Sequence, residues 1–446
     1  MSFYVLLKEI AEIEMGQSPT SNNVNSNRIG LPLLNGPTEF TSRYPIPIQF
    51  TESAKKISQK GDILFCVRGS TTGRMKADRP YAIGRGLAAI RGKNGYPTSY
   101  IRVIVEQNLA KLLAAATGST FPNVGRDLLL NFEVQVLSKN EAQYISNIVD
   151  LIDNKIHLNN QINQTLESIA QAIFKSWFID FEPVRAKIAA KQTGQDPELA
   201  AMCTISGKSK TELEQMAADD FAELQATAAL FPDELVESEL GEVPKRWEVS
   251  NFKGFCKKIE SGGTPKRSEL HYWNGEIRWL SSGEVRETVV LDTKEKITKT
   301  GLLNSSAKLW EKYTTVIAMY GATAGQVCLL ANEMAANQAC CGLIPKDEFK
   351  SFAFLIARNS VRSLSDKASG SAQQNLNKGI IENQPCVLPR LSVARNFENL
   401  VFPLLRKWLA NSEENIRLSV IRDSLLPKLL SGEVDVSGLQ DEGIDG

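Results

Sequence analysis

The sequence has few of the residues from which metal centres and histidine-based active sites are built. Only two histidines, His157 and His271, occur in 446 residues, and they lie far apart in the chain. The seven cysteines follow no regular spacing, and the adjacent Cys340 and Cys341 are unlike paired zinc ligands. We therefore expect reduced thiols, no bound metal and no catalytic triad, with the two histidines in a helix and a loop.

Long apolar runs and nucleotide-binding motifs are also missing. No stretch approaches the roughly 18 apolar residues of a membrane span, and residues 1–20 lack the pattern of a secretion signal. The turn at 69–74 has glycines but not the Lys-Ser/Thr ending of a phosphate-binding loop. The sequence boxes of amino-methyltransferases and metal-dependent nucleases are absent as well. We expect a cytoplasmic protein, not associated with a membrane, that has no catalytic residues of its own.

The formal net charge of zero conceals an uneven distribution along the chain. Residues 1–140 carry 17 basic against 10 acidic side chains, and residues 247–389 carry 18 against 14. The segment between them is acidic, because residues 181–246 carry 7 basic and 13 acidic side chains. This distribution suits two globular parts that contact phosphate and a connecting part that does not.

An internal duplication is the strongest pattern in the sequence. Residues 116–178 match residues 368–430 at a constant offset of 252 positions, and the turn at 69–73 matches at the same offset. Further upstream, residues 13–19 match at an offset of 246. For example, Gly16 corresponds to Gly262, and Asn123 corresponds to Asn375. Each copy is too long to be a solenoid repeat. The chain is therefore predicted to contain two similar domains that imitate a two-fold symmetric dimer.

Each copy ends in a long helical pattern with an apolar stripe of the coiled-coil kind. The stripe begins near Ala142 in the first copy and near Phe397 in the second, with apolar residues at intervals of three or four. The natural partner of each helix is the equivalent helix of the other copy, packed antiparallel. Asn159 and Asn411 interrupt the stripe, and they either fix its register from a buried position or face solvent or another protein. Pro427 is predicted to end or kink the second helix near Leu426.

The globular part of each copy has the pattern of a twisted sheet with long polar loops. The runs 61–67 and 313–319 are rich in β-branched and aromatic residues and are followed by glycines, as in short strands. We therefore predict an α+β fold, with two globular domains joined by two long antiparallel helices that form an intramolecular coiled coil. Polar loops of this kind commonly carry binding residues.

The loops contain the side chains that contact bases and phosphates in DNA complexes. Arginine can pair with guanine, Asn and Gln can pair with adenine, and Ser, Thr and Lys can hold phosphates. Taken singly, each of these residues is more often a solvated loop side chain than a base contact, and only the matched sets in two basic domains favour DNA. The candidates are Ser18, Arg68, Ser70, Thr72, Arg74, Lys76, Arg79, Arg85, Thr120 and Asn123 in the first copy, and Thr264, Lys266, Arg267, Ser281, Arg286, Tyr320, Thr323, Gln326, Asn337, Gln338, Gln373, Gln374 and Asn375 in the second.

Equivalent loop positions differ between the copies. In the alignment of the two copies, Arg68 corresponds to Tyr320, and Arg85 corresponds to Gln338. Two domains with one scaffold and different side chains would recognise two different half-sites, so we expect an asymmetric, split target.

The chain resembles the specificity subunits of type I restriction-modification systems over nearly its whole length. The segments that carry the resemblance include 174–183, 231–244, 262–265 and 424–432. The resemblance implies two target-recognition domains, double-stranded DNA as ligand, two methyltransferase subunits as partners and, in the restricting complex, two translocating nuclease subunits. It also implies that S-adenosylmethionine, ATP and magnesium are bound by those partners and not by this chain. The first copy departs from the pattern at Ser18 and at 83–85.

This interpretation gives the chain six parts. They are a first target-recognition domain at 1–140, a long helix at 141–180, an acidic, partly helical connector at 181–246, a second target-recognition domain at 247–389, a second long helix at 390–432 and an acidic tail at 433–446. Two alternatives of other classes are a self-contained DNA methyltransferase and a structural coiled-coil adaptor that reads no sequence.

Overall fold

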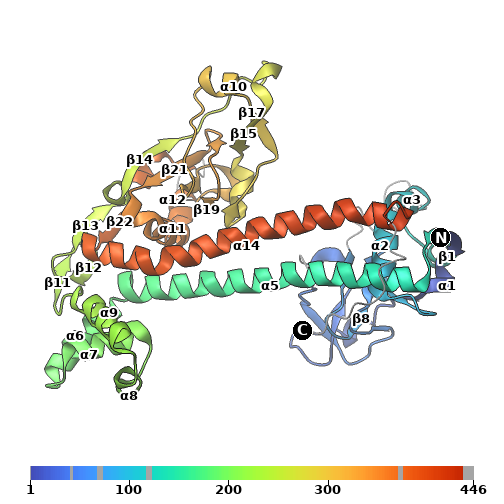
Figure 1. The fold of residues 1–446 in the computed structure, drawn as a ribbon, viewed down its shortest axis with the longest axis horizontal. Helices are drawn as coiled ribbons and strands as arrows, with labels where there is room; N and C mark the ends of the chain where they lie inside the picture. Colours follow the sequence, from blue (N-terminus) through green and yellow to red (C-terminus); the bar gives the residue numbers. More distant parts are fainter. Residues whose placement is uncertain (1, 41–43, 68–73, 117–122, 370–374, 435–446) are drawn as a thin grey trace. The chain divides into compact units, whose positions relative to one another are not determined.

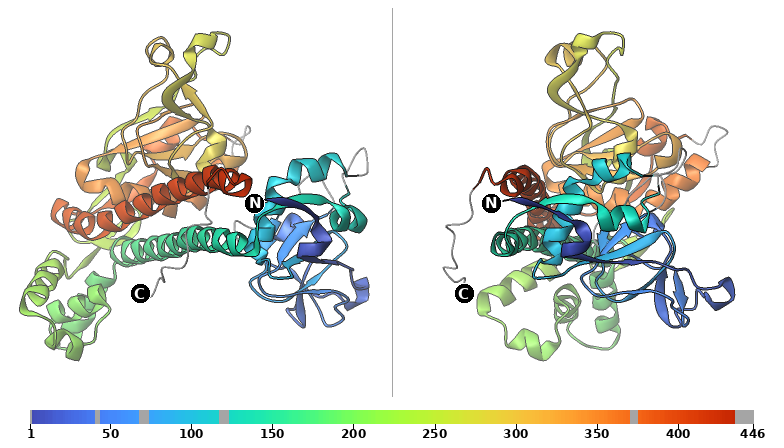
Figure 2. Two further views of the ribbon diagram at one scale, coloured as in Figure 1. Left: turned by 45° about the vertical axis from the view of Figure 1, so that its right-hand side comes forward. Right: turned by 90° about the vertical axis from the view of Figure 1, so that its right-hand side faces the viewer.

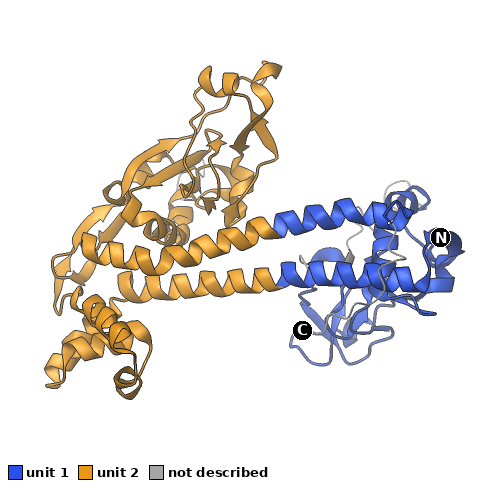
Figure 3. Ribbon diagram, viewed as in Figure 1, with its two compact units in different colours: residues 1–157, 415–446 blue, residues 158–414 orange. Residues whose placement is uncertain are grey.

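The computed structural model describes the chain except for residues 1, 41–43, 68–73, 117–122, 370–374 and 435–446 (Figure 1). The chain forms two compact units (Figure 3). Unit 1 comprises residues 1–157 and 415–446, and unit 2 comprises residues 158–414. Within the described ranges, no helix is long and apolar enough to cross a membrane.

In the part of unit 1 that the structure describes, the strands form two four-stranded sheets and a two-stranded ribbon. One sheet has the order β2 (Ala11–Met15), β9 (Leu87–Gly92), β6 (Ile63–Cys66) and β7 (Arg74–Lys76). The smaller sheet has the order β4 (Gln49–Thr51), β3 (Leu31–Leu34), β8 (Tyr81–Ile83) and β5 (Ile57–Ser58). The ribbon pairs β1 (Phe3–Leu6) with β10 (Glu133–Val136), and the helices are α1 (Leu7–Ile10), α2 (Thr98–Gln107), α3 (Leu109–Ala114) and α4 (Arg126–Asn131).

Unit 2 repeats this plan with a larger main sheet. Its five strands have the order β14 (Cys256–Ser261), β21 (Cys340–Pro345), β18 (Thr315–Ala318), β19 (Val327–Leu330) and β16 (Val289–Val290). The smaller sheet has the order β17 (Glu295–Ile297), β15 (Trp273–Leu280) and β20 (Ala335–Ala336), and the ribbon pairs β13 (Glu248–Asn251) with β22 (Pro385–Leu388). The helices of this part are α10 (Lys299–Leu303), α11 (Lys350–Asn359), α12 (Val361–Ser369) and α13 (Lys378–Glu382).

The predicted strands at 61–67 and 313–319 are confirmed as β6 and β18. All four residues of each strand are buried, because both faces of each sheet are covered. In β6, Ile63 and Phe65 belong to one apolar cluster, and Leu64 and Cys66 belong to another. A strand that is buried on both faces of its sheet needs a nearly continuous run of apolar residues.

Strand register confirms the duplication and refines its alignment. Ile63 of β6 lies opposite Ile90 of β9, and Thr315 of β18 lies opposite Leu343 of β21. Ile63 and Thr315 are 252 positions apart in the sequence, whereas their partners Ile90 and Leu343 are 253 positions apart. The second copy therefore has one additional residue between β18 and β21.

The two long helices are α5 (Lys139–Phe178) and α14 (Leu391–Ser431), and they run antiparallel (Figure 2). In unit 2, Asn411 Nδ2 donates to Asn163 Oδ1 at 3.0 Å, and Asn159 Nδ2 donates to Glu414 Oε2 at 2.8 Å. In unit 1, an ion pair of 2.8 Å joins Arg422 Nη1 of α14 to Asp153 Oδ1 of α5. The predicted antiparallel pairing is thus confirmed in both units.

The two stripe asparagines are buried between the helices. Asn159 is 1% exposed and Asn411 is 2% exposed, so neither faces solvent. Asn163, which the sequence analysis did not single out, completes this polar layer and also donates to Ser412 Oγ at 3.1 Å. A buried polar layer favours one register of the two helices, because a shifted register would leave these amides without hydrogen-bond partners.

Pro427 was predicted to end or kink the second helix, and the first of these alternatives is wrong. Helix α14 continues to Ser431, beyond the proline. Leu429 and Leu430 follow Pro427 and are buried in the core of unit 1. Tertiary packing therefore stabilises the last turn and outweighs the one backbone hydrogen bond that proline cannot make.

The acidic connector is folded. It contains α6 (Glu182–Gln192), α7 (Pro197–Ser206), α8 (Lys210–Glu214) and α9 (Ala218–Ala229), followed by a hairpin of β11 (Leu235–Ser238) and β12 (Gly241–Pro244). Ser209 and Glu212 form a reciprocal cap at the start of α8, and Asp196 caps α7. Its aromatic residues Phe181 and Phe231 join the core of unit 2.

Candidate nucleic-acid interface

In unit 1, backbone hydrogen bonds bring the candidate loops to one place. The loop after β2 contacts the segment that joins β8 to β9, and that segment also contacts the ends of β3 and β6. The bonds are Gly16 N to Leu87 O at 2.8 Å, Gln17 N to Ile83 O at 2.8 Å, Gly84 N to Leu34 O at 2.8 Å, Val67 N to Gly86 O at 2.9 Å and Val124 N to Val67 O at 2.9 Å. We call this convergence of loops the loop cluster of unit 1.

Unit 2 has the same loop cluster, made by equivalent bonds. They are Gly262 N to Cys340 O at 2.9 Å, Gly263 N to Ala336 O at 2.8 Å, Asn337 N to Leu280 O at 2.9 Å, Met319 N to Ala339 O at 2.7 Å and Leu376 N to Met319 O at 2.8 Å. Each of these bonds matches one in unit 1 at offsets of 246, 252 or 253. The sequence motifs that seemed scattered are therefore neighbours in both units.

Glycine is required where the loops cross. A Cβ atom on Gly16 would lie 2.1 Å from the carbonyl oxygen of Gly84, and a Cβ on Gly262 would lie 2.3 Å from that of Asn337. Both approaches are closer than any side chain allows. These two glycines of the candidate motifs therefore allow the loops to cross closely, which positions the neighbouring side chains.

Polar side chains project from the loop cluster of unit 1. The hydroxyl of Ser18 donates to Asn35 Oδ1 at 3.3 Å and accepts from the backbone N–H of Arg85 at 3.2 Å. Asn35 in turn donates to Gln49 Oε1 at 2.9 Å. The side chain of Arg85 is exposed beside them. Ser18 and Arg85, predicted from separate motifs, are thus brought together.

The equivalent side chains also meet in unit 2. The hydroxyl of Thr264 donates to Gln338 Oε1, and these residues correspond to Ser18 and Arg85. Asn337 lies next to Gln338, and its side-chain oxygen accepts the N–H of Ala339 at 3.1 Å. Tyr320 is 40% exposed at the end of β18. The two clusters therefore have one backbone plan and different side chains.

Other candidates of unit 2 hold the turns of this region. Ser281 and Glu284 cap the short helix η5 (Ser282–Arg286), from which the side chain of Arg286 is exposed. Thr323 is 5% exposed and donates to the carbonyl oxygen of Tyr320 at 3.4 Å. Gln326 and Asn375 are half-buried.

Several candidate cations contact other protein groups. Arg267 forms two bonds with Glu295, one of them Nη2 to Oε2 at 2.9 Å, and its guanidinium lies 3.8 Å from the ring centre of Trp273. The bonds with Glu295 raise the pKa of Arg267 above its ordinary value. Lys266 Nζ lies 3.3 Å from Glu269 Oε1. Arg267 therefore supports the fold of its loop, whatever else it contacts.

In unit 1, Lys76 lies 3.8 Å from Asp150 of α5, and Arg79 lies over the ring of Tyr81 at 5.6 Å. Asn123 is half-buried beside the loop cluster. The candidates Arg68, Ser70, Thr72, Thr120, Gln373 and Gln374, and the side chain of Arg74, lie outside the described residues.

Two residues of the site were missed by the sequence analysis, Asn35 and Gln49. Their signal was present, because the offset of 246 places Asn35 opposite Ser281, which was already a candidate. Strand pairing confirms that correspondence, since Leu33 pairs with Gln49 in unit 1 and Trp279 pairs with Glu295 in unit 2.

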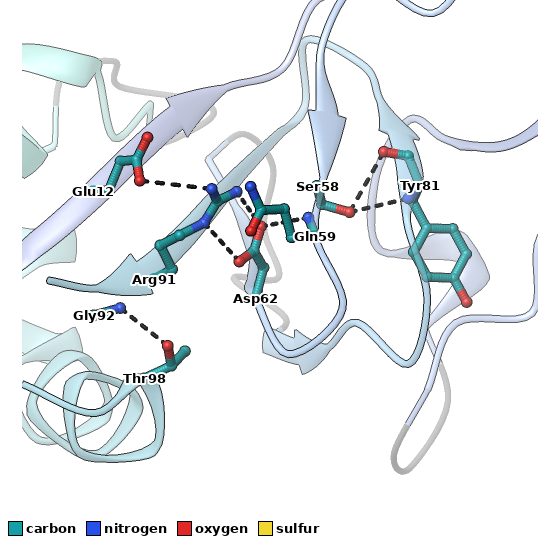
Figure 4. A network of polar contacts seen from close by, with 8 residues as sticks. All are labelled: Glu12, Ser58, Gln59, Asp62, Tyr81, Arg91, Gly92 and Thr98. Atoms are coloured by element: carbon teal, nitrogen blue, oxygen red, sulfur yellow. Dashed lines mark hydrogen bonds and ion pairs between the residues drawn. The ribbon is translucent and has the colours of Figure 1, made fainter.

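An ion-pair network supports the strands that carry the cluster of unit 1 (Figure 4). Arg91 of β9 makes two bonds to the buried Asp62, at 2.9 and 2.8 Å, and lies 3.6 Å from Glu12 of β2. Asp62 also accepts the backbone N–H of Gln59 at 2.7 Å. The bonds to Asp62 raise the pKa of Arg91 above its ordinary value.

Comparison with known proteins gives one family. The family model described as type I restriction modification DNA specificity domain matches residues 4–168 and 244–395. The HindI specificity subunit of Haemophilus influenzae is 33% identical over 406 residues, covering 85% of this chain and 88% of the relative. The MjaIX specificity subunit of Methanocaldococcus jannaschii is 25% identical over 394 residues, covering 87% and 81%.

The fold has a relative among solved structures. A type I restriction-modification S subunit from M. genitalium superposes with a TM-score of 0.58 over 96% of each chain, at 14% sequence identity. The family model matches once in each copy of the duplication, which agrees with two similar units. The chain therefore belongs to the family of type I restriction-modification DNA specificity subunits.

Proposed function

We propose that this chain recognises a bipartite, asymmetric DNA sequence, with each unit reading one half. The observation that carries this proposal is the loop cluster, which has one backbone plan in both units but different side chains. Ser18 and Arg85 occupy the positions that Thr264 and Gln338 occupy in unit 2. Arginine prefers guanine and glutamine prefers adenine, so the two halves of the target differ.

The long helices set the number of unspecified base pairs between the two halves in this proposal. A helix advances about 1.5 Å per residue, so its length fixes a distance as a rigid spacer does. The buried layer of Asn159, Asn163 and Asn411 supports a single register. Removing equivalent turns from α5 and α14 should change the spacer and leave both half-sites unchanged.

Specificity subunits of this family are not catalysts, and the chemistry is carried by their partners. We propose two methyltransferase subunits that dock on the helices and the acidic connector, and two restriction subunits in the full complex. S-adenosylmethionine, ATP and magnesium would be bound by those partners. The complex would act in the cytoplasm, where its DNA target is found.

A mobility-shift assay on the chain with its methyltransferase partner tests the proposal. Methylation mapping in a host that expresses the pair first gives the target sequence. The complex should bind that duplex at least ~10³-fold more tightly than a scrambled duplex of equal length. Equal affinity for both would refute sequence recognition, and would favour a structural adaptor.

A domain exchange tests which globular domain recognises which half-site. Replacing residues 1–140 by those of a relative should change one half of the methylated sequence and leave the other half and the spacer as they were. The reciprocal exchange of residues 247–389 serves as the matched control. Methyl transfer by the isolated chain would instead support the self-contained methyltransferase.

A further inference from the structure

In unit 1, the side-chain amide of Gln49 is held in one orientation at the edge of the loop cluster. Gln49 is the first residue of β4, and it lies opposite Leu33 of β3. Because opposite residues in an antiparallel pair project to the same face, Gln49 and Asn35, two residues beyond Leu33, lie on one face. Asn35 Nδ2 donates to Gln49 Oε1 at 2.9 Å, which fixes the oxygen of that amide.

A second bond fixes Asn35 itself. The hydroxyl of Ser18 donates to Asn35 Oδ1 at 3.3 Å, and the same hydroxyl accepts the N–H of Arg85 at 3.2 Å. Gly84 provides the room for this arrangement, since a Cβ there would lie 2.2 Å from Asn35 Oδ1. The chain of bonds therefore extends from the crossing of the loops to the amide of Gln49.

The amide of Gln49 keeps unused hydrogen-bonding capacity. An amide has two N–H donors and two acceptor lone pairs, and the contacts of Gln49 within the described part of the chain use one lone pair. Gln49 is half-buried, with exposed Asn35 beside it. A partly desolvated amide with a free donor and a free acceptor is suited to a ligand group that offers an acceptor next to a donor.

We propose that Gln49 reads an adenine in the half-site bound by unit 1, and that Asn35 is its positioning residue. The inference rests on the proposed function and extends it to a residue pair. Adenine presents N7 as acceptor and the N6 amino group as donor in the major groove, which match the free N–H and oxygen of a side-chain amide. Of the four bases, adenine is the one that offers this pair to one amide.

The equivalent positions of unit 2 cannot do the same. Glu295 occupies the place of Gln49, and both of its oxygens are bound by Arg267. Ser281 occupies the place of Asn35, and its hydroxyl donates to Glu284 at 2.6 Å. Of these two equivalent positions, only the one in unit 1 therefore carries an amide that can pair with adenine, in agreement with different half-sites.

Base analogues test this assignment in the complex with the methyltransferase partner. The probes are duplexes of the mapped target in which each adenine in turn is replaced by 7-deazaadenine, which lacks the N7 acceptor. For one adenine of the half-site assigned to residues 1–140, the replacement should weaken binding of the wild-type complex about 10-fold. Gln49→Ala should weaken binding of the unmodified duplex by a similar factor and should no longer respond to that replacement.

Asn35→Ala should weaken binding less than Gln49→Ala, and its response to the same analogue should be reduced but not abolished. Ile48→Ala is the matched control, because Ile48 precedes Gln49, is 63% exposed and projects to the other face. This control should bind as the wild type does.

The inference is overturned if the Gln49→Ala complex binds the unmodified duplex as tightly as the wild-type complex does. It is also overturned if each 7-deazaadenine duplex weakens binding of the wild-type and Gln49→Ala complexes by the same factor. Failure of the proposed function looks different, because then the wild-type complex would not prefer its mapped target over a scrambled duplex. Thermal unfolding of each variant complex separates loss of binding from loss of the fold.

Discussion

The two units attach their globular parts to the long helices by different chemistry. In unit 1, Asp153 of α5 is bonded by Arg102 of α2 and by Arg422 of α14. The positions that correspond to these three residues in unit 2, at the offset of 252, are Leu405, Phe354 and Ala170, all buried in one apolar cluster. The same junction is thus ionic in one unit and apolar in the other.

The main sheets show the same contrast. Arg91 of unit 1 pairs with Asp62, whereas the strand register places Ile344 and Thr314 at those positions of unit 2. Ile344 is 8% exposed and belongs to an apolar cluster. Thr314 is buried, and its hydroxyl donates to the carbonyl oxygen of Glu311 at 2.8 Å. Exchange of a buried ion pair for well-packed uncharged side chains is often neutral for stability, so one scaffold accepts both. The two units should therefore respond differently to truncation, salt and pH.

The largest effect is expected from truncating an aromatic side chain in unit 2. Phe397 is fully buried, and its ring centre lies 4.8 Å from that of Phe178 and 5.8 Å from that of Trp177. Phe397→Ala should lower the free energy of unfolding of unit 2 by about 4 kcal/mol, because it removes buried area and leaves a cavity. Hydrogen exchange of the amides in each unit would measure it.

The control for this truncation lies one turn further along α14. Leu400 is 46% exposed, so Leu400→Ala should change the stability by less than about 0.5 kcal/mol. A loss of protection spread equally over both units after Phe397→Ala would contradict the assignment of this cluster to unit 2.

An intermediate effect is expected from breaking the ionic junction of unit 1. Asp153→Asn leaves Arg102 and Arg422 without their shared carboxylate and should cost about 2 kcal/mol, less than a fully buried pair because these side chains are 17–27% exposed. Chemical unfolding at low and high salt would show this cost, and the stability of the variant should depend less on salt than that of the wild type.

A triple substitution sharpens the comparison. Unit 1 can be given the apolar side chains of unit 2 by three substitutions, Arg102→Phe, Asp153→Leu and Arg422→Ala. The triple variant should be more stable than Asp153→Asn alone, since no buried charge is left unpaired. Asp423, which also bonds Arg422, is exposed and can be solvated by water. If it is less stable, the apolar and ionic junctions are not interchangeable.

The last comparison concerns pH, and the sign of the effect differs between the units. Burial alone would raise the pKa of Asp153, but the guanidinium of Arg102 and then that of Arg422 outweigh it, so the pKa lies below its ordinary value. Its stabilisation is therefore present above the ordinary carboxyl pKa and is lost as the pH falls through the lowered one.

In unit 2, burial raises the pKa of Glu398 to about 7, against the lowering effect of its bonds with Ser351. Unit 2 should therefore lose stability as the pH rises from about 4.5 to about 7. Glu398→Gln should remove this dependence and stabilise unit 2 by about 3 kcal/mol at pH 8, while changing little at pH 5. Unfolding curves at the two pH values would test it, and an equal effect at both would refute it.

Much of the fold could be predicted from local and repeated patterns. The duplication, the strands β6 and β18 and the antiparallel helices follow from periodicity, because apolar spacing is dictated by the face that must be buried. Pro427 shows the limit of local reasoning, since the burial of Leu429 and Leu430 extended α14 past the proline.

The candidate site was predictable in part. Four of the predicted DNA-binding residues are brought together in pairs by the structure, Ser18 with Arg85 and Thr264 with Gln338. The loops that form each cluster are separated by tens of residues, so their proximity depends on strand pairing across the sheet. Arg267 shows the other side of this limit, because its binding to Glu295 depends on a strand far along the chain.

By itself, the sequence determined that there are two similar units with paired helices, because repetition and apolar periodicity are properties of the chain alone. The tertiary structure decided which polar side chains meet. The amide of Gln49 is oriented by Asn35, and that contact exists because β3 and β4 pair in one register. Hydrogen-bond geometry between distant residues is set by packing, and a one-residue shift would place these side chains on opposite faces.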